Sequence, residues 1–206
     1  MLVELLTSCA LAQVALPPET PIDAPRHMTE AELAWVAEHP ITPPQTATAP
    51  PTGPVVCPGE YEPMDGIMIA WTGPSSWLAI LRQMGAFITT DGDANLYVVV
   101  PSASARTSAE SSLQAGGADM SRVQFMIKSL NTIWCRDYGP RYIYQGDCRA
   151  IVDHTYNRPR PADNGVPAAF SDFKSHAYYE LPLVHGGGNY HLSSTGASFS
   201  TRLIAN

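Results

Sequence analysis

Residues 96–101 have the sequence LYVVVP, and this short run determines how the central part of the chain is built. An uninterrupted apolar run rich in β-branched residues is typical of a strand that is buried on both faces, and the proline ends it. Two similar runs flank it, IMIAW at residues 67–71 and VQFMI at residues 123–127. The sequence therefore predicts three buried strands between residues 67 and 127.

The segments between these strands have helical character. Residues 76–87 carry apolar side chains at helical spacing. Thr107 and Glu110 have the spacing of a capping box, which predicts a helix over residues 107–114. Alternation of strand and helix implies right-handed crossovers and a mostly parallel sheet, so the expected fold class is α/β.

The pattern changes after residue 134, where helical periodicity becomes rare. Residues 141–144 and 149–153 are predicted to form a hairpin around the turn at residues 145–147. Further strands are expected at residues 181–184 and 197–203. A hairpin added to parallel strands predicts mixed sheets.

Residues 17–58 differ in composition from the rest and contain 11 of the 19 prolines. Proline fixes φ and removes a backbone donor, so we expect a linker without a packed core. Thr29 and Glu32 have the spacing of a capping box and predict one short helix at residues 30–39, which Pro40 ends.

Residues 1–16 form a candidate signal or lipoprotein segment. ALAQ at residues 10–13 is typical of the end of a secretory signal, and LTSC at residues 6–9 resembles a lipoprotein cleavage box that would attach a lipid to Cys9. Because a basic leader is missing, an ordinary N-terminal helix and a mis-assigned or clipped start remain alternatives. No run reaches the roughly 18 apolar residues of a membrane span. We expect a secreted, periplasmic or lipid-anchored bacterial protein, with a cytoplasmic protein as the alternative.

The composition limits the classes of partner. The chain has 206 residues, of which 45% are hydrophobic and 15% charged, a composition sufficient for a globular core. A net charge of -7 argues against a nucleic-acid surface and suits a cationic small molecule or peptide better.

The four cysteines form no CxxC pair, so a zinc knuckle is not expected, while a Cys57–Cys148 disulfide and free thiols both remain open. No glycine-rich phosphate motif follows a strand, which argues against a nucleotide-binding fold.

Three polar motifs follow the strands. The first is TIWCRDYGP at residues 132–140, where Asp137 lies among aromatic residues. A carboxylate in such surroundings can bind a planar cation by two hydrogen bonds, although pairing with Arg136 or capping of the turn is the alternative. Cys135 is expected in a strand on the same face as Asp137, which disfavours a thiolate and favours a buried, inert thiol.

The second motif is DHTYNRPRP at residues 153–161. Arg158 and Arg160 each precede a proline, so both are expected in extended backbone. Residues two apart in an extended segment share a face, which would make the two guanidinium groups a clamp for a carboxylate or phosphate. A solvated loop with surface ion pairs is the alternative.

The third motif is HGGGNYH at residues 185–191. Its glycines permit close approach of the backbone to a ligand, and His191 is a candidate general acid/base. The alternative is a histidine at a strand edge. A metal site built from Asp153, His154, His185 and His191 is not expected, because no compact HxH or HExxH spacing supports it.

Together these motifs resemble one family, the bacterial (Porphyromonas-type) peptidylarginine deiminases and agmatine deiminases of the guanidine-modifying enzyme superfamily. GEYEPMD at residues 59–65, followed by IAW at residues 69–71, resembles the family's opening strand. WCRDYGP at residues 134–140 resembles its WxRDxGP element, and GGNYH at residues 187–191 resembles the lead into its HxDG element. The similarity extends over residues 59–203.

The resemblance implies a five-bladed α/β propeller (a pentein) that needs no metal and no organic cofactor. It also implies a reaction in which a cysteine attacks the guanidinium carbon and water releases a ureido product plus ammonia. By position, Asp137 would bind the substrate guanidinium and His191 would be the general acid/base. Trp134, Gly187 and Asn189 belong to the same motifs and would line the substrate site.

The resemblance also bears on the substrate, a small-molecule guanidine or a peptide with a C-terminal arginine. Arg158 and Arg160 resemble the arginine pair with which the peptidylarginine branch binds a C-terminal carboxylate. This favours C-terminal peptidylarginine or free arginine over agmatine, which has no carboxylate.

Three departures from the family pattern weaken the implied activity. Ser193 stands where the family has a second guanidinium-binding aspartate, and Ser194 replaces the following glycine. Loss of one carboxylate costs several kcal/mol of cation binding, since a charged hydrogen bond contributes about 1.5–3 kcal/mol. The family's nucleophilic cysteine lies downstream of residue 206. We therefore expect residues 59–206 to be an incomplete, partial propeller domain that is inactive alone, or else a non-catalytic exported module that binds arginine-containing peptides.

Overall fold

The computed structural model describes residues 15–45, 47–193 and 195–202. The predicted lipidation site at Cys9 and the substitution at Ser194 lie outside the described residues. Within the described part of the chain, no helix is long and apolar enough to cross a bilayer.

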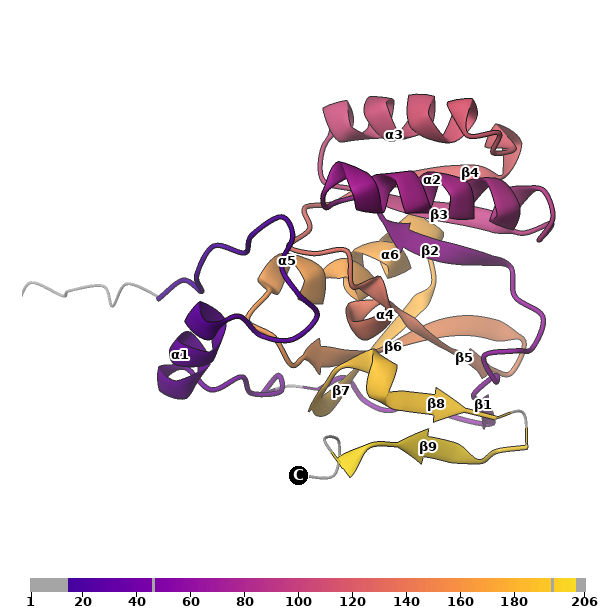
Figure 1. The fold of residues 1–206 in the computed structure, drawn as a ribbon. Coiled ribbons are helices and arrows are strands. Elements are labelled where there is room, and N and C mark those ends of the chain that lie inside the picture. Colours follow the sequence, from indigo (N-terminus) through magenta and orange to yellow (C-terminus); the bar gives the residue numbers. More distant parts are fainter. Residues whose placement is uncertain (1–14, 46, 194, 203–206) are drawn as a thin grey trace, which may run out of the picture.

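The first sheet contains three parallel strands in the order β2-β3-β4. They are β2 (Gly66–Ala70), β3 (Asn95–Val100) and β4 (Val123–Ile127). Helices α2 (Ser75–Thr89) and α3 (Ala103–Ala115) connect the strands, and Figure 1 shows both helices on the same face of the sheet. The predicted α/β segment with its parallel sheet is confirmed.

Strand β3 is buried on both faces, as its apolar run predicts. Leu96, Val98 and Val100 pack into a core with side chains of α2 and α3. Tyr97 and Val99 point to the opposite face and pack into a second core, shared with the C-terminal half of the domain. The central strand therefore joins the two halves of the domain.

The predicted capping box of the second helix is wrong. Helix α3 begins at Ala103, because the hydroxyl of Ser102 accepts a hydrogen bond from the amide of Ala105 at 3.2 Å. Thr107 lies inside the helix and donates from Oγ1 to the carbonyl of Ala103. An N-cap five residues upstream of Thr107 thus determines the helix start.

The second sheet is mixed and has the strand order β1-β5-β6-β7. Its strands are β1 (Val55–Val56), β5 (Arg141–Gln145), β6 (Cys148–Tyr156) and β7 (Ala177–His185). β5 and β6 form the predicted antiparallel hairpin, whereas β6 and β7 are parallel. The parallel crossover contains α5 (Pro161–Asn164) and α6 (Val166–Lys174). The expected mixed sheets are therefore present.

The C-terminal half contains more helix than expected. Besides α5 and α6 it has α4 (Cys135–Tyr138). Two of these three helices have four residues each, too few to show a helical period in the sequence. The described chain ends with a separate antiparallel pair, β8 (Tyr190–Leu192) and β9 (Ser198–Ser200).

The proline-rich segment is mostly extended, but it is attached to the domain. Its one helix, α1 (Glu30–Glu38), has the predicted capping box between Thr29 and Glu32. Ala24 is buried, and β1 adds an edge strand to β5. Backbone carbonyls and one buried carboxylate of this segment bind side chains of the domain. Figure 1 shows it passing α5 before it reaches β1.

Candidate active site

The motif that contains Asp137 is a helical turn, not the end of a strand. Tyr138 anchors the turn, since its buried side chain donates a hydrogen bond from the hydroxyl to the carbonyl of Thr132 at 2.6 Å. In a helix, residues two apart point in different directions. The expectation that Cys135 and Asp137 share a strand face is therefore wrong.

The Asp137 side chain is buried, with 5% of its surface exposed, and its Oδ1 accepts a hydrogen bond from the amide of Gly188 at 3.2 Å. Gly188 is part of a short 3-10 turn, η2 (Gly187–Asn189). A Cβ on Gly188 would lie 2.5 Å from Oδ1 of Asp137, and one on Gly187 would lie 2.9 Å from the carbonyl of Arg136. The glycines are thus required for the close approach of this turn to α4.

His191 is on β8, directly after this turn. Its Nε2 donates to the carbonyl of Gly188 at 3.1 Å. Its Nδ1 lies 3.1 Å from Nη2 of Arg136 and 3.2 Å from Oε2 of Glu60. A neutral ring can accept from the guanidinium at Nδ1, and a protonated ring can donate to the carboxylate. Both charge states of the imidazole therefore have a partner.

Glu60 and Arg141 are site residues that the sequence did not point to. Burial opposes ionisation of Glu60, but hydrogen bonds from Arg136 and His191 outweigh it and lower the pKa of its carboxyl. The guanidinium of Arg141 donates from Nη2 to the carbonyls of Gly187 and Tyr190, which fixes the backbone before His191. These contacts join residues 46 to 131 positions apart, a distance over which local spacing carries no signal.

His154 and His185 lie behind the Asp137 backbone. Their rings stack with centroids 3.8 Å apart, and Nε2 of His154 donates to the carbonyl of Asp137 at 3.2 Å. Burial, with a contribution from His185, lowers the pKa of His154 to about 3, and burial also lowers the pKa of His185. Both rings are therefore neutral at physiological pH, and His154 holds the backbone of Asp137 through its hydrogen bond.

The described residues contain no group of three or more histidine, cysteine, aspartate or glutamate side chains that could hold a metal ion. Asp153, one of the four residues considered above for a metal site, makes a different contact. Its Oδ2 accepts from the hydroxyl of Tyr178 at 2.6 Å, and burial raises the pKa of its carboxyl to about 6.

The two arginines of the second motif have different partners. Arg160 is 1% exposed and forms a buried ion pair with Glu32, whose Oε1 lies 2.7 Å from Nε. Arg158 is half-buried and donates from Nη1 to the carbonyl and side-chain oxygens of Asn157, both at 2.8 Å. Arg160 is thus paired with a residue of the N-terminal segment in this structure, and the paired clamp stays a prediction.

The other predicted substrate-binding residues surround this centre. Trp134 donates from Nε1 to the carbonyl of Ala24 at 2.9 Å, and the amide of Asn189 donates to the carbonyl of Gly186 at 2.9 Å. At the position of the family's second aspartate, the hydroxyl of Ser193 lies 2.8 Å from that of Thr195 and is part of the β8–β9 turn. Of the two positions at which the family pattern predicts a guanidinium-binding carboxylate, only residue 137 carries one among the described residues.

Three cysteines fall within the described residues, and all three are free thiols. Cys57 and Cys148 are both exposed, and no disulfide joins them. Burial raises the pKa of the Cys135 thiol to about 11, with smaller contributions from Asp163 and Asp137, and its Sγ lies 3.6 Å from the carbonyl of Met68. Cys135 is therefore a poor nucleophile at neutral pH.

A cleft of about 840 Å³ lies beside the site, between the two sheets. Glu60, Arg136 and Arg141 line it on the side of the site, whereas Met68 and Phe170 line it deeper down. Asp137 and His191 do not line this cleft. The cleft therefore shares Glu60 and Arg136 with the polar cluster around His191.

Comparison with known proteins connects this geometry to one group of enzymes. The sequence model of the Porphyromonas-type peptidyl-arginine deiminase family matches residues 56–205. Among solved structures, the fold is similar to that of C. jejuni agmatine deiminase, with a TM-score of 0.56 and 18% identity over 70% of this chain and 44% of that one. A variant of that enzyme with substrate bound gives a TM-score of 0.58 and 17% identity over 72% of this chain and 46% of the other. The chain thus spans less than half the length of these proteins.

Proposed function

The chain belongs to the Porphyromonas-type peptidyl-arginine deiminase family, and from this premise we propose that it provides the guanidinium-binding part of a deiminase site. In this proposal Asp137 binds the substrate cation and His191 transfers protons. The observation that carries it is the link through Gly188, which hydrogen-bonds both side chains. A buried carboxylate beside a histidine with partners for both charge states suits a reaction that needs a bound cation and a proton exchange.

The proposed reaction replaces one nitrogen of the guanidinium by oxygen. A thiolate adds to the guanidinium carbon, ammonia leaves with a proton from the general acid, and water then displaces the sulfur to give the ureido product. Among the described thiols, Cys135 is buried with a raised pKa, and Cys57 and Cys148 are exposed and lie outside the three polar motifs. We therefore propose that this chain alone binds guanidines without turning them over.

We also propose that the two sheets are successive blades of a five-bladed propeller and that β8 and β9 begin a third. Each sheet has its own covering helices, α2 and α3 on the first and α6 on the second. The chain spans 44–46% of the length of the related chains, which supports two of five blades and the beginning of a third. In such a propeller the site would lie where the blades converge.

The proposed substrate class is a guanidine that carries a carboxylate, as in a peptide with a C-terminal arginine. Arg158 supports this choice, because its half-buried guanidinium lies next to the aromatic ring of Tyr156 at 6.0 Å and on the same loop as Asn157. The alternative is a smaller guanidine such as agmatine. An agmatine deiminase with a similar fold has been solved with its substrate bound.

A second candidate function is a non-catalytic module that binds arginine-containing peptides. Ser193 favours it, since a hydroxyl in a turn replaces one of two expected carboxylates. The two functions share the binding step and differ in turnover.

Calorimetry with three matched peptides tests the binding step. The peptides end in arginine, in arginine amide and in lysine. We expect the free arginine peptide to bind most tightly, the amide less tightly and the lysine peptide least, since an ammonium cannot form two parallel hydrogen bonds with a carboxylate. Equal affinity for arginine and lysine would overturn the guanidinium assignment. Citrulline release from the first peptide by this chain would overturn the proposal of binding without turnover.

A further inference from the structure

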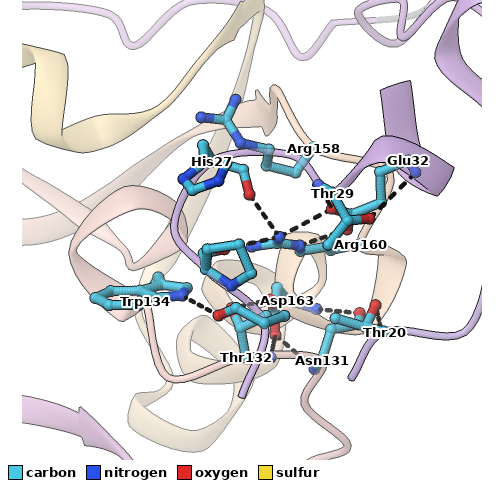
Figure 2. A network of polar contacts seen from close by, with 12 residues as sticks. Thr20, His27, Thr29, Glu32, Asn131, Thr132, Trp134, Arg158, Arg160 and Asp163 are labelled. Carbon is cyan, nitrogen blue, oxygen red and sulfur yellow. Dashed lines mark hydrogen bonds and ion pairs between the residues drawn. The ribbon is translucent and has the colours of Figure 1, made fainter. Parts of the chain in front are cut away.

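The N-terminal segment crosses the face of the proposed peptide site. Residues 20–32, here called the strap, pass over Trp134, Arg158 and Arg160 (Figure 2). The sequence motifs predict all three of these side chains as substrate-binding residues, and the proposed function uses Arg158 among them. The contacts between them and the strap are therefore the contacts that a peptide would need.

Four consecutive backbone carbonyls of the strap accept hydrogen bonds from these three side chains. Nε1 of Trp134 donates to the carbonyl of Ala24 at 2.9 Å, and Nε of Arg158 donates to that of Arg26 at 3.1 Å. Nη2 of Arg160 donates to the carbonyls of Pro25 at 2.9 Å and His27 at 3.2 Å. An extended peptide presents its carbonyls to a binding surface in the same way.

The strap also supplies a carboxylate to Arg160. Oε1 of Glu32 lies 2.7 Å from Nε of Arg160 and Oε2 lies 3.0 Å from Nη2, so the pair is bidentate, and both residues are 1% exposed. Thr29 fixes the position of this carboxylate through the capping box of α1. Glu32 thus binds one of the two guanidinium groups that the sequence predicts as the clamp for a substrate carboxylate.

A guanidinium of the strap lies near Asp137. The point that a Cβ on Gly188 would occupy is 2.5 Å from Oδ1 of Asp137 and 3.8 Å from Nη1 of Arg26. Arg26 is exposed, and its side chain extends from the strap toward the turn that holds the proposed cation site. The strap therefore brings a carboxylate, a row of carbonyls and a guanidinium to one surface.

We propose that the strap is an intramolecular mimic of the bound peptide and that it must be displaced before a C-terminal arginine peptide can bind. The inference rests on the proposed function and on the predicted pairing of Arg158 with Arg160, because it takes these two arginines and Asp137 as the peptide site. Beyond α1, residues 40–45 and 47–53 contain no helix or strand and are mostly exposed, so the chain can move there without breaking a core. Closure of the strap lowers the apparent affinity by the fraction of molecules that are open.

Three variants of the whole chain test the proposal by calorimetry with a peptide ending in arginine, its amide, and agmatine. Glu32→Gln removes the carboxylate that pairs with Arg160, and we expect it to bind the free arginine peptide about tenfold more tightly through a larger open fraction, with a smaller gain for the amide. Arg26→Ala is expected to improve binding of all three ligands, agmatine included. Glu38→Gln is the matched control, because Glu38 is an exposed residue of the same helix, and its affinities should equal those of the unmodified chain.

Thr29→Ala keeps the proposal testable if Glu32→Gln fails to fold. It weakens the capping box while leaving the charge of Glu32 in place. It should shift affinity in the same direction as Glu32→Gln. Hydrogen exchange gives an independent readout, because amides of residues 24–39 should exchange faster when saturating peptide is added to the unmodified chain.

The outcomes separate the inference from the function on which it rests. Peptide binding with equal affinity in all variants, with the strap amides still protected, would overturn the inference alone. If no variant bound any of the three ligands, the proposed function would fail and the inference would fail with it.

Discussion

Asp137 and His191 are joined through a single residue, since the amide of Gly188 donates to Oδ1 of Asp137 and its carbonyl accepts from Nε2 of His191. The carboxylate comes from a helical turn and the imidazole from a strand 54 positions further along the chain. One peptide unit therefore sets the spacing between the proposed cation site and the proposed general acid/base.

Gly188→Ala should disrupt this relationship. The new Cβ would lie 2.5 Å from Oδ1 of Asp137, so the carboxylate or the turn must move. We expect a loss of about 1–3 kcal/mol in stability, as in other overpacked sites, and weaker guanidine binding. Denaturant unfolding and calorimetry measure the two effects. Gly165→Ala is the control, because its nearest contact would be the Lys128 ammonium at 3.4 Å, and a matching loss there would contradict the account.

Arg158→Ala should weaken binding of a C-terminal arginine peptide more than Arg149→Ala does. Arg158 lies beside the motif residues, whereas Arg149 is on the hairpin strand β6 and lies 3.9 Å from Asp65. Loss of a charged hydrogen bond predicts an affinity about tenfold lower or more for Arg158→Ala. Calorimetry with the free and amidated peptides checks this, and equal effects of the two substitutions would argue against the loop assignment.

The pH dependence of stability should carry a contribution from His154. Its pKa is about 3 in the folded chain and near 6.5 when exposed, so the unfolded chain takes up the proton first as the pH falls. This contribution to stability is complete above pH 6.5 and is lost progressively toward pH 3. As the pH falls below about 6, the free energy of unfolding should decrease in both proteins. The decrease should be about 1.4 kcal/mol per pH unit smaller in His154→Phe than in the unmodified chain. Urea unfolding between pH 7.5 and 4.5 measures the slopes, and parallel slopes would show that His154 is already protonated in the fold.

The three described thiols should react at different rates with iodoacetamide. Cys57 and Cys148 are exposed, but the raised pKa of Cys135 leaves about 0.1% of it as thiolate at pH 8. Mass spectrometry of peptides from briefly treated protein should show modification at residues 57 and 148 well before residue 135. Rapid labelling of Cys135 would make it a candidate nucleophile after all.

The parts of the fold that could be predicted are those with local signals. β3 has a continuous β-branched run and α1 has a capping box, and both are present as predicted. Helix α4 has four residues and therefore no period, so the sequence predicts a strand there and places Cys135 on the wrong face. The site depends on pairs that are distant in sequence. Glu32 was identified as a cap, which it is, but its second role requires Arg160, which lies 128 residues away.

The site residues show the same division. The motifs make Asp137 and His191 candidates by residue type, and the resemblance to the deiminases implies their roles. Glu60 had no such signal, since its partners Arg136 and His191 reach it only after the two halves of the domain have packed. Local spacing therefore predicts which groups are available, and tertiary contacts determine which of them meet.

Calorimetric titration of agmatine into the unmodified chain, Asp137→Asn and the control Asp147→Asn tests the central claim most directly. Agmatine has no carboxylate, so the titration isolates the guanidinium site, and Asp147 is an exposed residue of the hairpin turn. The account predicts binding by the unmodified chain and by Asp147→Asn, with an affinity about 10- to 100-fold lower for Asp137→Asn. Equal affinities in all three proteins would show that the Asp137 carboxylate does not hold the cation.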